Sequence, residues 1–131
     1  MKQILSLFLF TTLIISCKTE TCAGTEYIDG ITYKNGKPYT GKCITHWQDF
    51  SMRSIKEYKN GLDHGEWTFY YQNGNIQTTG SFFEGKRMGE WKYFYESGKL
   101  WKQHLYNANG NPEGKWFTFN KEGQKIDSTL H

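Results

Sequence analysis

Cys43 and His46, with Asp49 three residues further on, are the side chains whose types and spacing most suggest chemistry. A cysteine, a histidine and a carboxylate in one short stretch are typical of a metal site, or of a thiol nucleophile with its base. Structural zinc needs four ligands, however, and this solitary cluster does not supply them. The elements that carry these residues decide between a chemical and a structural use.

The segment around Cys43 belongs to an internal repeat. The stretch Gly65-Glu66-Trp67-Thr68-Phe69-Tyr70-Tyr71 is copied at residues 89–95, more loosely at 114–119 and faintly at 41–47. The leading glycines are 24, 24 and 25 residues apart. A fixed period of this size indicates a repeat architecture.

In the register of this repeat, Cys43 stands where the other units have tryptophan, and His46 where they have a second aromatic residue. Both are therefore predicted to be structural, core-facing residues. The corresponding residues are Trp67, Trp91 and Trp116 for the first position, and Tyr70, Phe94 and Phe119 for the second. Each set is expected to form an aromatic ladder across neighbouring units, and the two ladders together are predicted to be the core.

The other acid–base candidates are equally consistent with architecture. His64 and His104 fall in a turn and in a return strand, far apart in register. Glu66 and Glu90 recur before two of the tryptophans, but Lys115 replaces them in the last unit. Recurrence within repeats indicates architecture, whereas a catalytic site is normally built once. The sequence therefore predicts no enzyme, no catalytic residue, no metal site and no cofactor.

Glycine-containing turns divide the chain into short strands. Between them lie runs of six to eight residues that are rich in Trp, Tyr, Phe and Thr and alternate as a strand must. The prediction is an all-β fold: an elongated single-layer antiparallel meander of about four β-hairpin repeats, without helix. The turns within a unit are expected at residues 72–75, 96–99 and 121–124, and the turns between units at 34–37, 59–62, 84–86 and 108–111.

The consensus Gly-x-Trp-x-x-aromatic-aromatic-x-x-Gly-x-aliphatic resembles the variant MORN repeat, in the family often labelled YwqK-type antitoxin. The resemblance spans roughly Tyr33 to Lys125. It implies hairpin units that pair edge to edge, and a toxin as partner. The first unit departs from the pattern, with Cys43 in place of tryptophan and no clear turn glycine after Trp47, as expected of a capping repeat. Residues 27–131 are assigned to this repeat domain.

Residues 1–16 are predicted to be a secretory signal peptide. Lys2 is followed by an apolar and hydroxylic run from Ile4 to Ile15, which is too short to cross a bilayer. The alternative is a buried N-terminal strand or helix, for which nothing downstream supplies a partner.

The stretch Ile14-Ile15-Ser16-Cys17 resembles the bacterial lipobox. This resemblance implies that the mature chain begins at a lipidated Cys17. The next residue is Lys18 rather than Asp, which resembles the signal for sorting to the outer membrane. Residues 17–26 are then the lipidated cysteine and a polar tether. The expected location is the bacterial cell envelope, lipid-anchored, facing the periplasm or the exterior.

The other two cysteines, Cys22 and Cys43, form an even number in an oxidising compartment. A bridge between them is one expectation, and two free buried thiols are the alternative. The formal net charge is +3, with charges interspersed along the chain. Because the chain has no basic run, nucleic acid is not an expected partner. Binding of lipid headgroups would need clustered Lys and Arg, which the chain also lacks.

Positions that vary between otherwise matched units are the candidates for recognition. Trp101, Lys102 and His104 replace a glutamine, a threonine and a glycine of the preceding unit, and Trp47 is interpreted as out of register. Exposed aromatics suit protein contact or sugar stacking, although Trp47 and Trp101 equally suit covering a sheet end. The main hypothesis is a protein-binding envelope lipoprotein, antitoxin- or immunity-like. The alternatives are a glycan-binding surface lipoprotein and a purely structural envelope component.

Overall fold

The computed structural model describes residues 19–131, which form twelve strands in two sheets. The predictions for the signal peptide, for lipidated Cys17 and for Lys18 fall outside the described residues. Within residues 19–131 there are strands and turns but no helix, so none that is long and apolar enough to cross a membrane. The predicted all-β class is confirmed.

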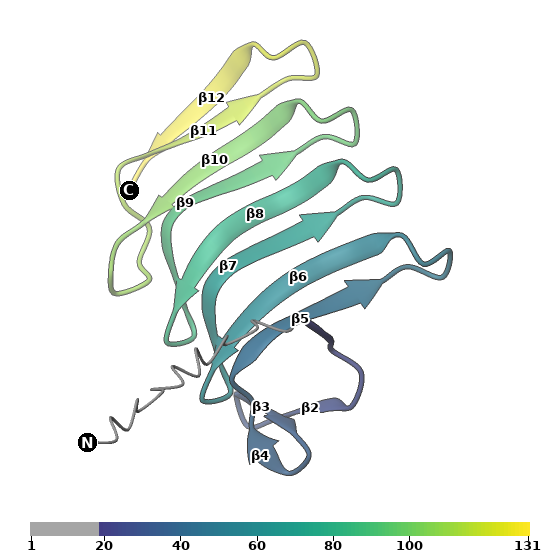
Figure 1. Ribbon diagram of the computed structural model, residues 1–131. Coiled ribbons are helices and arrows are strands. Elements are labelled where there is room, and N and C mark those ends of the chain that lie inside the picture. The colour runs from purple at the N-terminus through teal and green to yellow at the C-terminus, as the bar shows by residue number, and fades with distance from the viewer. Residues whose placement is uncertain (1–18) are drawn as a thin grey trace, which may run out of the picture.

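The larger sheet has nine strands in the order β1-β5-β6-β7-β8-β9-β10-β11-β12. From β5 onward each strand pairs antiparallel with the next one in the chain, so the predicted meander of consecutive hairpins is confirmed (Figure 1). The strands of this meander are β5 (Gly41–His46), β6 (Met52–Lys59), β7 (Leu62–Tyr70), β8 (Ile76–Phe83), β9 (Lys86–Phe94), β10 (Leu100–Tyr106), β11 (Lys115–Phe119) and β12 (Lys125–Leu130).

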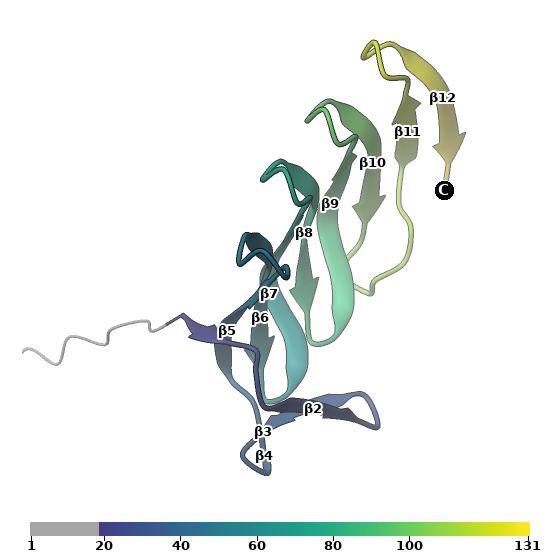
Figure 2. The ribbon, with the colours of Figure 1, turned by 90° about the vertical axis from the view of Figure 1, so that its right-hand side faces the viewer.

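The N-terminal end is more elaborate than a meander preceded by a tether. Strand β1 (Glu20–Thr21) lies in the segment expected to be a tether, and it pairs parallel with β5. A separate three-stranded sheet follows, made of β2 (Thr25–Ile28), β3 (Ile31–Lys34) and β4 (Lys37–Pro38). Figure 2 shows this small sheet set across the end of the larger one. Residues from 27 onward therefore do not all belong to one layer.

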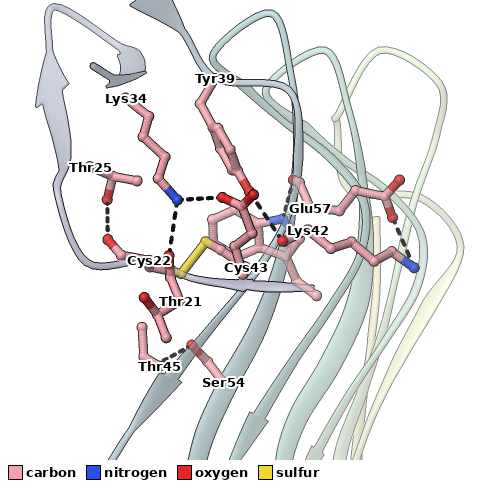
Figure 3. The surroundings of a disulfide bond; sticks show 12 residues. Thr21, Cys22, Thr25, Lys34, Tyr39, Lys42, Cys43, Thr45, Ser54 and Glu57 are labelled. Atoms are coloured by element: carbon pink, nitrogen blue, oxygen red, sulfur yellow. Dashed lines mark hydrogen bonds and ion pairs between the residues drawn. A yellow bond between two sulfur atoms is a disulfide. The ribbon is translucent and has the colours of Figure 1, made fainter. Parts of the chain in front are cut away.

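A disulfide between Cys22 and Cys43 fastens this end (Figure 3). Cys43 is fully buried and packs with Tyr58 and Trp67 in the core. On the other side of the bridge, the Cys22 amide donates to the Ile44 carbonyl at 2.9 Å. The bridge therefore joins the segment before the small sheet to the first full strand of the meander.

The core is a row of aromatic rings along one face of the sheet. Tyr58, Trp67, Trp91 and Tyr106 are each at most 8% exposed. The tryptophans are separated by rings from the return strands: Phe82 lies between Trp67 and Trp91, with centroid distances of 4.8 and 5.0 Å. Tyr58 packs on Trp67 at 5.4 Å, and Tyr106 on Trp116 at 5.3 Å. The tryptophans of the predicted ladder therefore do not contact one another directly, and aromatic residues of the return strands pack between them.

Each tryptophan of this row is also held by its indole N–H. Trp67, Trp91 and Trp116 donate to backbone carbonyls of the neighbouring return strand at 2.8, 3.1 and 3.0 Å. Cationic groups cover two of the rings, Lys56 on Trp67 and Arg87 on Trp91, at 5.0 and 4.6 Å from the ring centroids. A Cβ at Gly80 would overlap the Trp91 ring, so the glycine is required there.

The second predicted ladder was wrong. Among the described residues no ring contact joins Tyr70, Phe94 and Phe119, and these side chains are only half-buried. The neighbouring tyrosines connect the units instead. The hydroxyl of Tyr71 donates to the Phe94 carbonyl, and that of Tyr95 to the Phe119 carbonyl, each at 2.8 Å.

Candidate functional site

Four turns of identical geometry line one edge of the large sheet, the right-hand edge in Figure 1. In each turn the first residue donates its amide to the carbonyl four residues on, at 2.8–2.9 Å. The first residues are Trp47, Tyr71, Tyr95 and Asn120. Trp47 therefore holds the same position as the two tyrosines, and its assignment as out of register was wrong.

The fourth residue of each turn has a positive φ. Gly74, Gly98 and Gly123 take this position in three units, with φ of 86°, 85° and 91°. In the first unit it is Phe50, at φ 64°. The left-handed region costs a residue with a Cβ roughly 1–2 kcal/mol. Phe50 is nevertheless 87% exposed, so burial of its ring does not offset that cost.

A β-bulge follows every one of these turns. On the strand that follows each turn, two residues pair with consecutive residues of the preceding strand, and the one residue between them has no partner across that ladder. The flanking pairs are Met52 and Ser54, Ile76 and Thr78, Leu100 and Lys102, and Lys125 and Asp127. We call these four residues the bulge column: Arg53, Gln77, Trp101 and Ile126. Bulges re-aim side chains and are over-represented beside functional sites.

The bulge column is exposed, and its chemistry changes from unit to unit. All four side chains are exposed, and they supply a guanidinium, an amide, an indole and an aliphatic group. Two of them rest on the first residue of the turn before them. Arg53 lies 4.8 Å from the Trp47 ring, and Trp101 lies 5.8 Å from the Tyr95 ring. A constant backbone thus presents four different side chains in a row.

Apolar side chains are exposed along this same edge. Phe50 is 87%, Ile126 62% and Trp101 38% exposed. Met52 and Ile76, which begin β6 and β8, are 40% and 39% exposed. An edge with this much accessible apolar surface between polar turns is typical of an interaction site.

Two hollows flank Trp47 at the first turn. One, of about 360 Å³, is lined by His46, Trp47, Gln48, Arg53 and Gln72. The other, of about 490 Å³, has an apolar lining that includes Ile44, Trp47, Phe50 and the Cys22 end of the disulfide. The Trp47 indole N–H is buried and has no hydrogen-bond acceptor within residues 19–131. The equivalent Tyr71 and Tyr95 use their hydroxyls to bridge units, so this donor is a difference of the first unit.

The carboxylate beside these hollows is already engaged. Asp49 accepts hydrogen bonds from the Ser51 hydroxyl at 2.6 Å and from the Gln72 amide at 2.8 Å. These bonds, that of Ser51 first, lower the pKa of Asp49 below its ordinary value. Asp49 is therefore a turn-stabilising residue, and no carboxylate lines the hollow with Arg53.

Cys43, His46 and Asp49 do not form a shared chemical site. Cys43 is in the disulfide, and Asp49 closes the turn. His46 is exposed and lines a hollow, so its expected place in an aromatic ladder was wrong. Within the described part of the chain no three His, Cys, Asp or Glu side chains are grouped to hold a metal ion.

The predicted recognition residues separate into two kinds. Trp101 belongs to the bulge column, with Lys102 Nζ 4.3 Å above its ring. His104 belongs to the aromatic row, because it stacks on Trp116 at 3.8 Å with an interplanar angle of 12°. Burial first, and then the charges of Lys102 and Arg87, lower the pKa of His104. His104 is therefore a packing residue of the aromatic row. Trp47 lies two units away, at the first turn.

Sequence reasoning missed Arg53, Gln77 and Ile126. The signal was present, since each bulge residue follows the positive-φ turn residue by three positions: Phe50, Gly74, Gly98 and Gly123. The missing glycine in the first turn concealed the register. With Phe50 recognised as its substitute, the column could have been aligned.

Replacement of Phe50 by glycine is expected to raise the free energy of unfolding by about 0.5–1 kcal/mol. Glycine removes the left-handed strain, and the greater entropy of the unfolded chain offsets part of the gain. Denaturant melts of residues 19–131 measure the change. Gly74→Ala, at the same position of the next turn, should shift stability in the opposite direction. A loss of stability in Phe50→Gly would mean that the phenylalanine packs in the folded state.

Comparison with known proteins identifies two of the units. The model of the MORN repeat variant matches residues 63–83 and 89–108, the hairpins β7–β8 and β9–β10. No curated protein and no solved structure matches the chain. The fold defines the class of protein as a β-hairpin repeat module, and two of its adjacent units match the model of the MORN repeat variant.

Proposed function

We propose that this chain is a non-enzymatic repeat module that binds another protein through the turn edge of its large sheet. The observation that carries the proposal is the bulge column, in which one backbone geometry displays Arg53, Gln77, Trp101 and Ile126 side by side. Variation at a fixed structural position suits recognition, whereas the buried row keeps a tryptophan at the same position in three of its four units.

The dimensions of this edge suit a protein partner. Neighbouring strands lie about 4.8 Å apart, so equivalent residues of successive hairpins are about 10 Å apart. The four bulge residues then span about 30 Å, which is comparable with one side of a standard protein–protein interface. Trp101 and Arg53 also suit this role, because tryptophan, arginine and tyrosine are the residue types that most often dominate the binding energy of an interface.

The proposed setting is the bacterial cell envelope, with the module held at the outer membrane by lipid on Cys17. The support is the resemblance of residues 14–17 to a lipobox, and a Cys22–Cys43 disulfide suits an oxidising compartment. The resemblance to the YwqK-type antitoxin family makes a toxin the first partner to test. In this setting such a toxin acts in the periplasm or arrives from outside, and an envelope component is the other protein partner.

The test is capture of partners from the native envelope fraction by immobilised residues 19–131, with identification by mass spectrometry. We expect one co-purifying protein whose recovery falls at least tenfold with Trp101→Ala, as for loss of an interface hot spot. The matched control is Leu105→Ala, on the same strand near the opposite edge, where a residue of the same 38% exposure is removed. Its recovery should match the wild type.

A glycan array run with the same protein tests the alternative function. The observation that favours glycan binding is the exposed Trp101 ring beside Tyr95, which offers a stacking surface for a sugar. Binding to glycans with no captured protein would replace the proposed function by this one. If Trp101→Ala and the wild type capture the partner equally well, the bulge column is not part of the binding surface.

A further inference from the structure

The first turn differs from its three equivalents in side-chain exposure, in hydrogen bonding and in the hollows beside it. It holds an exposed phenylalanine where the others have glycine. It carries an indole N–H without an acceptor, where two other units use a tyrosine hydroxyl to bridge. It has hollows on both sides of Trp47. Strained, exposed residues of this kind are found preferentially at ligand-contacting sites.

The charge of the first turn defines one feature of its ligand. Arg53 forms no ion pair with any residue that the structure describes, and its guanidinium lies on the Trp47 ring. His46 and Gln48 line the same hollow, and the only carboxylate of the turn, Asp49, is occupied by Ser51 and Gln72. A guanidinium without an ion-pair partner, in a hollow that no carboxylate lines, is complementary to a carboxylate of a ligand.

The second hollow defines the other feature. Its lining includes Ile44, Ala23, Cys22 and Phe50. This surface is complementary to a bulky apolar side chain rather than to the hydroxyls of a sugar. Trp47 lines both hollows, so the two ligand features must lie close together.

We infer that the first turn is a peptide-anchoring site, which takes an acidic side chain and a neighbouring bulky apolar side chain from an extended segment of the partner protein. The carboxylate binds the Arg53 guanidinium in the hollow that Arg53 lines together with Trp47. The apolar side chain enters the hollow that Phe50 and Trp47 line. This inference rests on the proposed function, because it names the part of the partner that the turn edge recognises.

The experiment is selection from a phage-displayed library of random short peptides on immobilised residues 19–131. Selected peptides are expected to place Asp or Glu beside Leu, Ile, Met or Phe. Arg53→Gln and Phe50→Gly should each weaken the selected peptides at least tenfold, as for hot-spot residues. The matched control Lys121→Gln removes one positive charge from the last turn of the same edge and should leave affinity unchanged.

Two further readouts make the outcome decisive. Phe50→Gly must melt at or above the wild-type temperature, which separates lost binding from lost folding. In the ¹H–¹⁵N spectrum, the Trp47 indole resonance, assigned by its loss in Trp47→Phe, should move on peptide addition. Peptides without acidic preference, or peptides insensitive to both substitutions, overturn the inference while the captured protein partner keeps the proposed function. If no peptide is selected and no envelope protein is captured, both the peptide-anchoring site and the protein-binding function are overturned, whether or not the glycan array shows binding of acidic sugars.

Discussion

Replacement of Trp91 by alanine is expected to lower the free energy of unfolding by about 3–5 kcal/mol, in the range for a buried tryptophan. Trp91 is 2% exposed, packs edge-on against Phe82 and is covered by Arg87. Its indole donates to the Ser81 carbonyl, so truncation also removes that hydrogen bond. Because the rings form one row, the gap opens in the middle of the core. Denaturant melts of residues 19–131 measure the loss.

The control for Trp91 is the other tryptophan of the same hairpin. Trp101 is 38% exposed and lies outside the aromatic row, so Trp101→Ala should cost less than about 1 kcal/mol. Similar losses for the two substitutions would contradict the assignment of Trp91 to the core and of Trp101 to the recognition surface. The pair therefore separates packing from binding within a single hairpin.

Removal of the disulfide by Cys22→Ser with Cys43→Ser is expected to lower stability by about 3 kcal/mol on the chain-entropy estimate. The bridge spans 21 residues of sequence and encloses the whole small sheet β2–β4. Cys43 is also fully buried against Tyr58 and Trp67, so a hydroxyl at that position adds a desolvation penalty.

Thermal melts with and without a reducing agent test this prediction on the unmodified chain. The reduced wild type should melt close to the double variant, and the reducing agent should leave the double variant unchanged. Equal stability of oxidised and reduced wild type would show that the bridge does not constrain the unfolded chain. If reduction does lower stability, amide exchange of the reduced chain locates the loss, which is expected in β1–β4 rather than in β7–β10.

The repeated part of the fold was predictable from sequence because every level of the pattern agreed. The glycine period, the turn residues and the alternation of Trp67, Phe69 and their equivalents all indicated hairpins, and the hairpins are present. The N-terminal sheet was not predictable in the same way. Strands β2–β4 are short, occur once and depend on the bridge and on contacts such as the Thr32 amide to the Gly61 carbonyl.

The recognition surface was predictable only in part. Trp101 stood out because its type is unusual at its repeat position, whereas Arg53, Gln77 and Ile126 are ordinary surface residues in sequence. Their common property is a backbone irregularity, the bulge, which is marked in sequence only by its distance of three positions from the turn residue and not by a residue type. The opposite error concerned His104, whose variation between units reflects stacking on Trp116 and not recognition.

The measurement that tests the central claim most directly is site-specific photo-crosslinking from the bulge column. A photoreactive amino acid is placed at Gln77, which is exposed between the Arg53 and Trp101 positions, and in a second sample at Met88, which is 37% exposed near the opposite edge. Illumination in the native envelope is predicted to give a covalent adduct with one partner protein from position 77 and none from position 88. An adduct from position 88 alone, or from neither position, would contradict binding through the turn edge.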